Sequence, residues 1–543
     1  MFALSNGHVF NLSDIPQVFF AHKYRGGNFI AFNLKFDSGS LLYNIPVKVL
    51  NYLREHNQVH YNGYNYKYIP HKMLRIRRGK NAVTFWDIFG FYGMGLDAAA
   101  KKYLGKSKLE VETKEFTAEY VKRNYDKLAK YCIRDAALTK ELADLYLSKL
   151  HAIGLYPSNL YSTASVAFQY YKQSCDIVTV WRFWEEVKPL LRYGCEAYYG
   201  GKVEITARGA FDGYEYDINS AYASEIAKLI DITDCKVRRL RKYDRDATYG
   251  YYRVYINNLT GIHHSIVHKR KNMNIYPAGS YYATITQAEL EYLQRYNIDV
   301  LVLEGYGLYI KKVRYPYRST VLKLQAIKEE YKETDLFVSN IAKLCNNSFY
   351  GKMAQLIEDY DGNLIAGVGW NSLYSSVITA NIRLKVAQVQ NDLGSACIAV
   401  HTDAVTTTIL LPARYLGDKL GQFVLKHQDK GIMILSGMYQ MGSKAAYRGF
   451  RMPKGFSWYD KLKSMGNRSK TALSFREAKS WITAVIQNKP EEINRFSDVS
   501  KELDLNADNK RLWLERTDAS KLLSGLEQSL PILYNEAYDK TRR

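Results

Sequence analysis

The spacing of apolar and polar residues divides the chain into stretches of different period. Apolar residues cluster or alternate at strand spacing in residues 28–34 and 82–89, whereas residues 96–104 and 128–150 carry them at helical spacing. Strands that alternate with helices favour a mixed sheet flanked by helices. Residues 1–155 are therefore predicted to form an α/β domain.

The pattern then changes three times toward the C-terminus. Strand patterns dominate residues 190–315, and helical spacing returns in residues 320–395. Two β-branched runs then flank His401-Thr402-Asp403 and predict a hairpin over residues 395–411. After about residue 455 the pattern is interpreted as helical to the end of the chain. A length of 543 residues predicts two to four domains. Together, the strand and helix patterns predict a multidomain protein of mixed α/β and α+β type.

Charge narrows the choice of partner. The formal net charge is +22, which indicates a polyanionic partner, either nucleic acid or an anionic membrane surface. No long uncharged apolar run and no signal-peptide pattern occur, so we expect an intracellular protein without a membrane span. The six cysteines include no CxxC pair, which argues against a disulfide framework or a zinc site.

Two acidic residues occupy the ends of predicted strands. Asp217 ends the strand in "GYEYDINSAY", and Asp403 lies at the tip of the predicted hairpin. Asp217 alone could cap the helix that follows, and Asp403 alone could mark a turn. If the two strands are neighbours, the carboxylates converge and can share divalent cations, as two-metal phosphoryl transfer requires.

A third candidate segment lies on a predicted helix. In "KLCNNSFYGK", Lys343, Asn347 and Tyr350 are spaced at i, i+4 and i+7, so a helix presents them on one face. A cation, an amide and an aromatic ring there could meet a triphosphate, a sugar and a base. The alternative is a half-buried helix that ends at a C-cap, Gly351.

Taken together, "DINSAY", "KLCNNSFYG" and "VHTDA" resemble, in order and approximate interval, the three polymerase motifs of family B DNA polymerases. The chain looks most like the compact, protein-primed branch of bacteriophages, linear plasmids and viruses. The resemblance implies an RNase H-like exonuclease-type domain followed by a right-hand polymerase. The implied boundaries are 1–155 for the exonuclease-like domain, 156–315 for the first part of the palm with inserted strands, 316–385 for the fingers, 386–455 for the second part of the palm and 456–543 for a helical thumb.

The resemblance implies a role for each matching residue of the polymerase site. Asp217 and Asp403 would be the catalytic acids that bind two Mg²⁺ ions, for which Mn²⁺ can substitute. Tyr222 would exclude ribonucleotides by filling the space of a 2′-OH. Lys343 would contact the triphosphate, and Asn347 and Tyr350 would line the pocket of the nascent base pair.

Two further segments would contact DNA. In "YYGGKVE", Tyr198, Gly200 and Gly201 match the Tyr-x-Gly-Gly motif between the exonuclease and polymerase domains. In "KAAYRGF", Tyr447 resembles the tyrosine of a Lys-x-Tyr motif that grips the primer, with the lysine displaced by one place to Lys444.

The hairpin departs from the family pattern. The usual motif reads Tyr, any residue, then Asp-Thr-Asp-Ser, so His401 stands at the first acid and Ala404 at the serine. Asp403 retains the second, indispensable acid. A neutral His401 could ligate or hydrogen-bond near a metal, but a surface turn histidine is the interpretation that the sequence favours.

The exonuclease motifs are incomplete. "NLKFD" resembles the second motif through Asn33 and Asp37, and "YCIRD" the third through Tyr131 and Asp135. The first motif, Asp-x-Glu, is missing, since the only acid before Asn33 is Asp14. Either the exonuclease is inactive and retained as a scaffold, which we favour, or the chain begins after its true start.

The resemblance implies template–primer DNA and dNTPs as partners, with a terminal protein as a candidate primer. From Lys343 to Asp403 is 60 residues, which is too short for the hairpin that bacteriophage members insert there for processivity and strand displacement. A non-catalytic DNA-binding relative is the main alternative, and retention of both acids beside Lys343 argues against it. A membrane-surface protein would leave these motifs unexplained.

Overall fold

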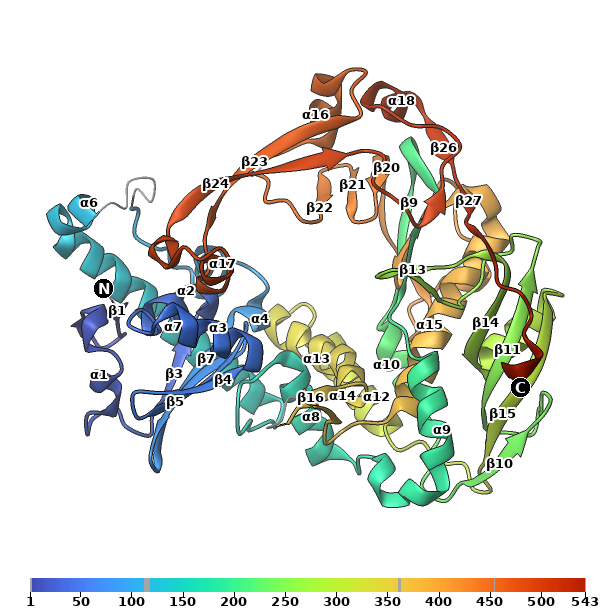
Figure 1. Ribbon diagram of the computed structural model, residues 1–543, viewed down its shortest axis with the longest axis horizontal. Coiled ribbons are helices and arrows are strands. Elements are labelled where there is room, and N and C mark those ends of the chain that lie inside the picture. The colour runs from blue at the N-terminus through green and yellow to red at the C-terminus, as the bar shows by residue number, and fades with distance from the viewer. Residues whose placement is uncertain (1, 112–117, 360–362, 454, 543) are drawn as a thin grey trace.

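The computed structural model describes residues 2–111, 118–359, 363–453 and 455–542. Figure 1 shows four parts arranged around a central opening: an N-terminal domain, a region of helices below the opening, a long central sheet, and a two-stranded arch that returns to the N-terminal domain. A second sheet is attached to the central sheet on the side away from the opening.

The N-terminal domain is built on a five-stranded mixed sheet. β3 and β7 are parallel, as expected for an α/β unit, and the other pairs are antiparallel. The strand order is β3 (Asn28–Ala31), β7 (Asn81–Asp87), β6 (Met73–Arg78), β5 (Tyr64–Ile69) and β4 (Gln58–Tyr61). The principal helices are α2 (Leu34–Leu41), α3 (Val47–His56), α5 (Leu96–Leu104) and α7 (Tyr125–Ala152). The shorter elements are β1 (Phe2–Ala3), β2 (Val9–Phe10), α1 (Gln17–Phe20), α4 (Phe89–Tyr92) and α6 (Ala118–Arg123). The α/β prediction for this region is confirmed.

The central sheet gathers strands from distant parts of the chain. Its order is β22 (Lys444–Tyr447), β21 (Met438–Met441), β20 (Phe423–Leu435), β9 (Ala207–Ile218), β19 (Ala404–Thr407), β18 (Cys397–Thr402) and β8 (Lys202–Ile205), and β26 (Leu526–Gln528) also pairs with β9. The predicted hairpin is therefore β18–β19, and it is inserted between β8 and β9.

The second sheet consists of the strands expected between residues 190 and 315, plus one from the C-terminus. Its order is β10 (Lys236–Leu240), β15 (Asp299–Tyr309), β11 (Tyr249–Asn258), β14 (Ala278–Thr286) and β28 (Leu533–Asn535). The neighbouring elements are β12 (His268–Arg270), β13 (Met273–Ile275) and α11 (Gln287–Arg295). The C-terminal tail thus completes two sheets that are formed by much earlier residues.

The helical region packs between the N-terminal domain and the central sheet (Figure 1). It contains α8 (Thr163–Ser174), α9 (Trp184–Ala197), α10 (Ala221–Ile226), α12 (Arg318–Glu330), α13 (Leu336–Ser348), α14 (Tyr350–Met353) and α15 (Ser372–Leu393). A short hairpin, β16 (Leu356–Glu358) and β17 (Leu364–Ala366), interrupts it. Gly351 lies inside α14, so the interpretation of Gly351 as a helix C-cap was wrong.

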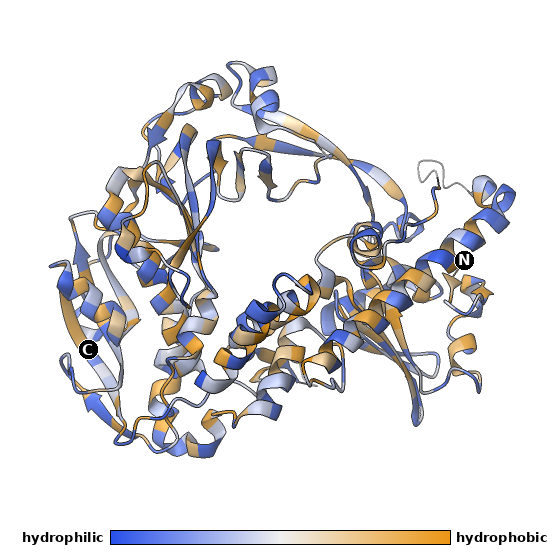
Figure 2. Ribbon diagram, turned by 180° about the vertical axis from the view of Figure 1, so that it is seen from behind, coloured by the Kyte–Doolittle hydropathy of each residue, from blue (hydrophilic) through white to orange (hydrophobic). Residues whose placement is uncertain are grey.

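The prediction of a helical C-terminal region was wrong for most of its length. Residues 470–478 and 496–504 form an antiparallel hairpin, β23 (Lys470–Ala478) and β24 (Phe496–Asp504), that we call the arch. Leu473 and Phe475 are buried between exposed neighbours, which is the period of two that a strand requires. Figure 2 shows the same mixture of hydrophobic and hydrophilic positions along the arch. The helices here are short: α16 (Trp458–Met465), α17 (Trp481–Ile486) and α18 (Ala519–Ser524). β25 (Arg511–Leu512) and β27 (Leu530–Pro531) form a further pair.

Candidate polymerase-type active site

The two acidic residues singled out in the sequence lie side by side. β19 pairs antiparallel with β9, and in this register Ala404 is opposite Asp217. The backbone oxygen of Asp403 accepts a hydrogen bond of 2.9 Å from the N–H of Ile218, which follows Asp217. Thr402 has a φ of 68°, so the hairpin turns sharply just before the acid. A separation of 186 residues along the chain is thereby reduced to one step across a sheet.

The surroundings of Asp217 and Asp403 raise the pKa of both carboxyl groups. Burial, followed by the nearby Asp217, raises the pKa of Asp403 from 3.8 to about 6, and Lys343 opposes this rise. Burial also raises the pKa of Asp217, while Lys426 and Lys343 act to lower it. Two half-buried acids that repel each other and have lysines nearby form a site in which bound cations are strongly favoured.

Lysines from three elements surround this pair. Lys343 comes from α13, as the motif predicts, and Lys328 from α12. Lys426 comes from β20, where it is the extra residue of a β-bulge between Leu425 and His427. A bulge re-aims its side chain relative to the regular strand, which is why alternation along β20 does not predict this position. Burial lowers the pKa of Lys328, and the positive charges of Lys343 and Lys426 act in the same direction. These three lysines therefore converge on one place.

Aromatic rings form the adjoining wall. Tyr222 of α10 stacks on Tyr350 of α14, with ring centroids 4.1 Å apart and planes 4° apart. Burial and the proximity of Tyr350 both raise the pKa of Tyr222. Burial also raises the pKa of Tyr198, with Tyr350 contributing, so Tyr198 belongs to the same cluster. Three tyrosines that are far apart in sequence thus lie together beside the acids.

The two adjacent asparagines of α13 have different environments. Asn346 is buried, and both ends of its side-chain amide are hydrogen-bonded: the oxygen accepts from the Tyr171 hydroxyl and the nitrogen donates to the backbone oxygen of Val321. The side-chain oxygen of Asn347 is buried without a hydrogen-bond partner among the described residues. An unsatisfied amide oxygen on the face shared with Lys343 supports Asn347 as the ligand-facing residue.

The Tyr-x-Gly-Gly segment packs against the β18–β19 hairpin. A Cβ atom at Gly201 would lie 2.4 Å from Cγ2 of Thr402, so only glycine permits this approach next to Asp403. Arg383 of α15 donates hydrogen bonds of 2.9 Å and 3.3 Å to the backbone oxygens of Tyr199 and Gly200. The loop is therefore held between the hairpin and a buried guanidinium.

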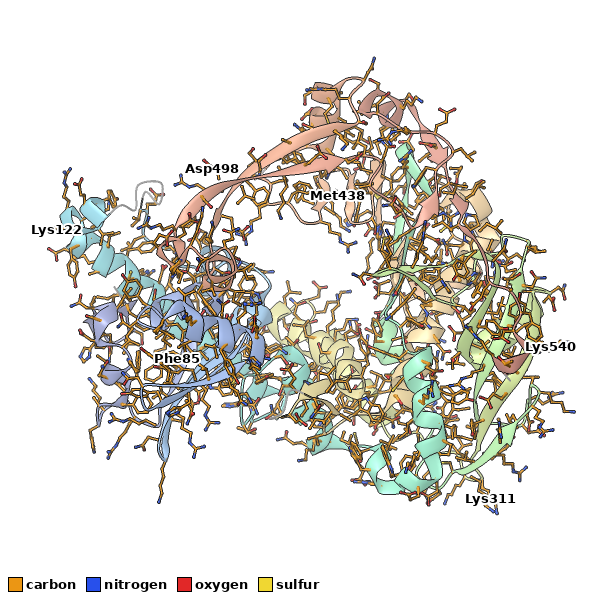
Figure 3. All side chains as sticks on the ribbon, in the orientation of Figure 1. Phe85, Lys122, Lys311, Met438, Asp498 and Lys540 are labelled. Carbon is orange, nitrogen blue, oxygen red and sulfur yellow. The ribbon has the colours of Figure 1, made fainter. Side chains whose placement is uncertain are left out.

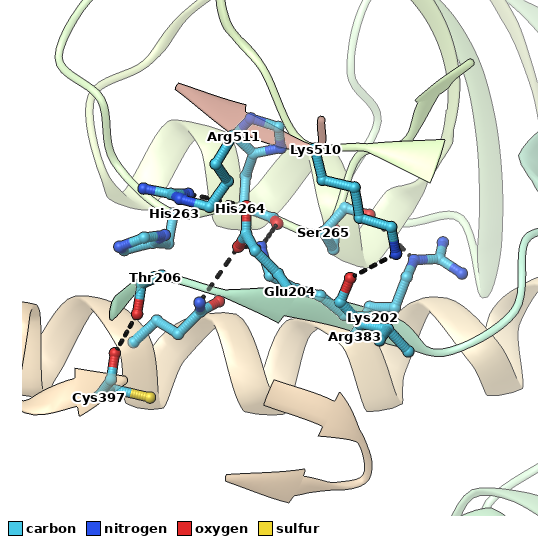
Figure 4. A network of polar contacts seen from close by, with 12 residues as sticks. Lys202, Glu204, Thr206, His263, His264, Ser265, Arg383, Cys397, Lys510 and Arg511 are labelled. Carbon is cyan, nitrogen blue, oxygen red and sulfur yellow. Dashed lines mark hydrogen bonds and ion pairs between the residues drawn. The ribbon is translucent and has the colours of Figure 1, made fainter. Parts of the chain in front are cut away.

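Figure 4 shows the buried polar network beneath this loop. Arg511, from the C-terminal segment, bonds to Glu204 at 2.8 Å, and Lys202 lies 3.2 Å from the same carboxylate. These positive charges outweigh the effect of burial and hold the pKa of Glu204 far below its usual value. Lys202 also donates a hydrogen bond to the backbone oxygen of His264, in the loop between β11 and β12. The network ties β8 to the C-terminal segment and to this loop, and sequence spacing contains no sign of it.

His401 is not a surface turn residue, so that interpretation was wrong. Its ring stacks on Tyr439, with centroids 5.3 Å apart and planes 18° apart. Burial lowers the pKa of His401 to about 4, which keeps it neutral at physiological pH. Its Nε2 atom is buried without a hydrogen-bond partner in the described part of the chain.

Lys444 and Tyr447, the predicted primer contacts, have separate surroundings. Lys444 forms an ion pair of 2.5 Å with Glu215, which lies two residues before Asp217 on β9. Tyr447 packs against Trp458 and Phe456 at the base of the arch. The structure brings Lys444 close to the acids, whereas Tyr447 belongs to the hydrophobic core of the arch.

The exonuclease-like residues form a second cluster in the N-terminal domain. Asp135 pairs with Lys108 at 2.6 Å, and the Lys108 ammonium lies 4.8 Å from the ring centroid of Tyr131. Burial raises the pKa of Asp37 to about 7, and the charges of Asp87 and Asp135 add to this effect. Asn33 begins α2 in a left-handed conformation. The sequence motifs did not reveal Lys108, because it precedes the third motif in a loop.

Asp87 is the only acid near Asp37 that could replace the missing first motif among the described residues, and it is already engaged. Its carboxylate accepts three backbone hydrogen bonds, from Asn33, Leu34 and Phe89, each of 2.9 Å. Asp14 is exposed and bonds to Ser13. The cluster therefore lacks the additional free carboxylates that a two-metal exonuclease needs.

We predict that Asp37→Asn stabilises the protein above pH 7. The folded-state pKa of Asp37, about 7, exceeds its ordinary value of 3.8, so folding favours the protonated form and stability is lost as pH rises through 7. Asparagine stays neutral at every pH. In thermal unfolding with a chelator present, we expect the melting temperature to rise by a few degrees at pH 8 and not at pH 4. Asp14→Asn, at an exposed site of the same domain, serves as the control, and an equal shift in both variants would contradict the prediction.

The described residues contain no group of three or more His, Cys, Asp or Glu side chains that could hold a metal ion by themselves. The pair Asp217 and Asp403 nevertheless fits a site for divalent cations that is completed by a substrate. Carboxylate oxygens are the ligands that Mg²⁺ prefers, and substrate phosphates commonly supply the remainder of its shell.

Across the described part of the chain, no helix combines the length and apolar character needed to cross a membrane.

One family model covers part of this site. Residues 99–367 match the family model "DNA polymerase type B, organellar and viral". This range includes Asp217, Tyr222 and Lys343 but not Asp403, whose assignment depends on the register of β19. No curated protein matches the chain.

The fold is similar to that of solved Phi29 DNA polymerase structures. The ternary complex with primer-template DNA and incoming nucleotides has a TM-score of 0.62 at 15% identity, and the match covers 90% of this chain and 93% of that one. The binary complex with primer-template DNA has a TM-score of 0.57 at 16% identity, covering 89% and 92%. An orthorhombic crystal form has a TM-score of 0.55 at 16% identity, covering 76% and 78%. The expected architecture, an exonuclease-type domain followed by a right-hand arrangement, is confirmed by this likeness.

Proposed function

We propose that this chain is a family B DNA polymerase of the viral type, a DNA-directed enzyme that adds dNTPs to a primer 3′-OH. The observation that carries this proposal is the adjacency of Asp217 and Asp403 on neighbouring strands, with Lys343 beside both. The central sheet would act as the palm, the helical region as the fingers and the arch as the thumb.

Asp217 and Asp403 would hold two Mg²⁺ ions, or Mn²⁺ in their place. When bound, these ions activate the attacking 3′-oxygen and stabilise the charge on the departing pyrophosphate. The protein contributes the placement of both carboxylates at one sheet edge, where each is half-buried. Because their pKa values are raised in the metal-free protein, cation binding must displace protons at low pH, and we expect metal affinity to fall as pH falls.

Lys343, Lys328 and Lys426 would bind the triphosphate. Each supplies a point charge from a different element, so the three can surround a polyanion rather than line one side of it. The net charge of +22 extends this attraction to the template and primer backbones. Binding to DNA should therefore weaken steeply as salt concentration rises.

The tyrosine cluster would read the sugar and the base. Tyr222 is buried by its stack on Tyr350 and cannot easily move aside, so it would exclude a 2′-OH. Asn347 and Tyr350 would line the pocket of the nascent base pair.

The DNA strands would contact two other segments. Tyr198, Gly200 and Gly201 would hold the template strand beside the hairpin. Lys444 would approach the primer, and Tyr447 would support it from the core of the arch. A terminal protein is a candidate primer.

The retained pair of acids favours this enzyme over a non-catalytic DNA-binding relative. The test is extension of an end-labelled primer on single-stranded template with Mg²⁺ or Mn²⁺, with shortening of the primer followed in the same lanes. We expect extension in the presence of dNTPs and no 3′ degradation in their absence, because the exonuclease-like cluster is incomplete. Failure to extend under either metal would overturn the assignment as a polymerase.

A further inference from the structure

The arch ends inside the core of another domain. The segment between β23 and β24 carries α17, and its Trp481 is fully buried together with Val485 among residues of the N-terminal domain. The Trp481 ring packs edge-on against Tyr68 of β5, with centroids 5.2 Å apart. Fully buried aromatic and aliphatic side chains are typical of the core of a well-packed interface.

Polar contacts flank this apolar interface. The Asn494 side chain donates a hydrogen bond of 2.9 Å to the backbone oxygen of Phe36, and Lys35 lies 3.5 Å from Glu477. A Cβ atom at Gly39 would lie 2.8 Å from Cγ2 of Ile493, so the side chain of Ile493 packs closely against the backbone of α2. Sequence separations of more than 400 residues are bridged here.

The opposite side of the N-terminal domain is fastened to the helical region. Lys149 pairs with Asp335, the N-cap of α13, at 2.6 Å. The Phe337 ring packs against Tyr103, with centroids 4.5 Å apart. The helical region continues into the central sheet through the main hydrophobic core, and the sheet continues into the arch through a core that includes Ile432 and Leu473.

These contacts form a closed circuit of four parts. Figures 1 and 2 show an opening at its centre that no segment crosses, from the front and from behind. Figure 3, with all described side chains drawn, shows that the opening remains, with Met438 beside it and Asp498 on the outer side of the arch. Each strand of the arch has nine residues, a span of roughly 30 Å.

Positive charge also lies on the inner row of the arch. Lys501 alternates with the outward Asp498 and donates a hydrogen bond of 2.9 Å to the backbone of Gly449. Arg451, from the same loop, pairs with Glu477 at 3.0 Å. The loop that carries Gly449 and Arg451 therefore braces the arch through contacts with both of its strands.

We propose that the N-terminal domain and the arch close a ring around the primer–template duplex, so that this domain anchors a topological clamp instead of proofreading. The inference depends on the proposed polymerase function, since it requires a duplex product beside the central sheet. A ring of this kind would keep the protein on DNA, and among the described residues between Lys343 and Asp403 the only strands before β18 are the short β16 and β17.

The test is a disulfide that locks the ring. Cγ2 of Ile493 is one bond from its Cβ, so the Cβ atoms of cysteines at 39 and 493 would lie no farther apart than about 4.3 Å, below the upper limit of ~4.5 Å for a disulfide. The full chain carries Gly39→Cys and Ile493→Cys in a Cys195→Ser background, because Cys195 is an exposed thiol. A non-reducing gel measures the fraction that is linked, and each single-cysteine variant serves as a control.

Protein that is oxidised before mixing should extend a primer on linear template as well as the reduced protein does. On a covalently closed circular template, its extension should fall to the fraction of unlinked molecules, and reductant should restore it. Protein that is oxidised after loading should stay on the circle through a high-salt wash and leave when the circle is cut. Equal extension of circles by linked and reduced protein would overturn the ring proposal, whereas absence of extension on linear template by every form would instead overturn the polymerase function.

Discussion

Asp403→Asn should reduce primer extension by about 10³-fold or more, since it removes half of the charge that holds the cations at the reacting atoms. Asn keeps the size and the tight turn at this position, so the fold and DNA binding should persist. The measurement is single-turnover extension of a labelled primer with saturating dNTP and Mg²⁺, alongside DNA affinity by anisotropy. Asp217→Asn should behave in the same way.

Asp212→Asn is the matched control for this prediction. Asp212 is an exposed acid on the same strand as Asp217, five residues earlier, so it tests whether loss of any carboxylate from β9 impairs the enzyme. We expect its extension rate to equal that of the unaltered protein. If Asp403→Asn retained a comparable rate, the two acids would not be the catalytic pair.

Tyr222→Ala should raise the use of ribonucleotides relative to deoxynucleotides by roughly 10²-fold, because discrimination here depends on steric exclusion and an apolar pocket alone rejects an added hydroxyl weakly. The stack of Tyr222 on Tyr350 fixes the ring that would meet the 2′-OH. The measurement is the ratio of kcat/KM for a dNTP and the matching rNTP in single-nucleotide addition.

The variant Tyr222→Phe distinguishes a steric contribution of the ring to sugar discrimination from a hydrogen-bonding contribution of the hydroxyl. It retains the ring and removes only the hydroxyl, so we expect discrimination to stay close to that of the unaltered protein. An equal loss of discrimination in Tyr222→Phe would assign the effect to the hydroxyl. No change in Tyr222→Ala would show that the sugar lies elsewhere.

The motifs located the candidate site because its chemistry is local in sequence. Asp217 is followed by Tyr222 within one strand–turn–helix unit, and Lys343, Asn347 and Tyr350 lie within eight residues. Short segments of this kind are recognisable without knowledge of their partners, since strand and helix periods depend on neighbouring residues. The exonuclease-like residues were found for the same reason.

The predictions were wrong where a local sequence pattern was compatible with two different structures. "SFREAKSWITAVIQN" contains apolar residues that suit a helix, yet most of its first half is a strand, because β24 supplies a partner from residue 496 onward. His401 looked like a surface residue because the ring that covers it, Tyr439, is contributed by a strand that the hairpin sequence does not specify. In both cases a distant segment decided the outcome.

The sequence by itself provided the resemblance to the family B motifs, the strand and helix character of most segments before residue 455, and the acids, lysine and tyrosines that carry the proposed chemistry. Only the tertiary structure decided that Lys426 is aimed at the acids by a bulge, that Arg383 holds the loop beside them while Arg511 bonds to Glu204 of β8, and that Trp481 closes the arch onto the N-terminal domain. The physical reason is that periodicity records which face of an element is buried but not which distant segment buries it, and each of these features depends on such a pairing.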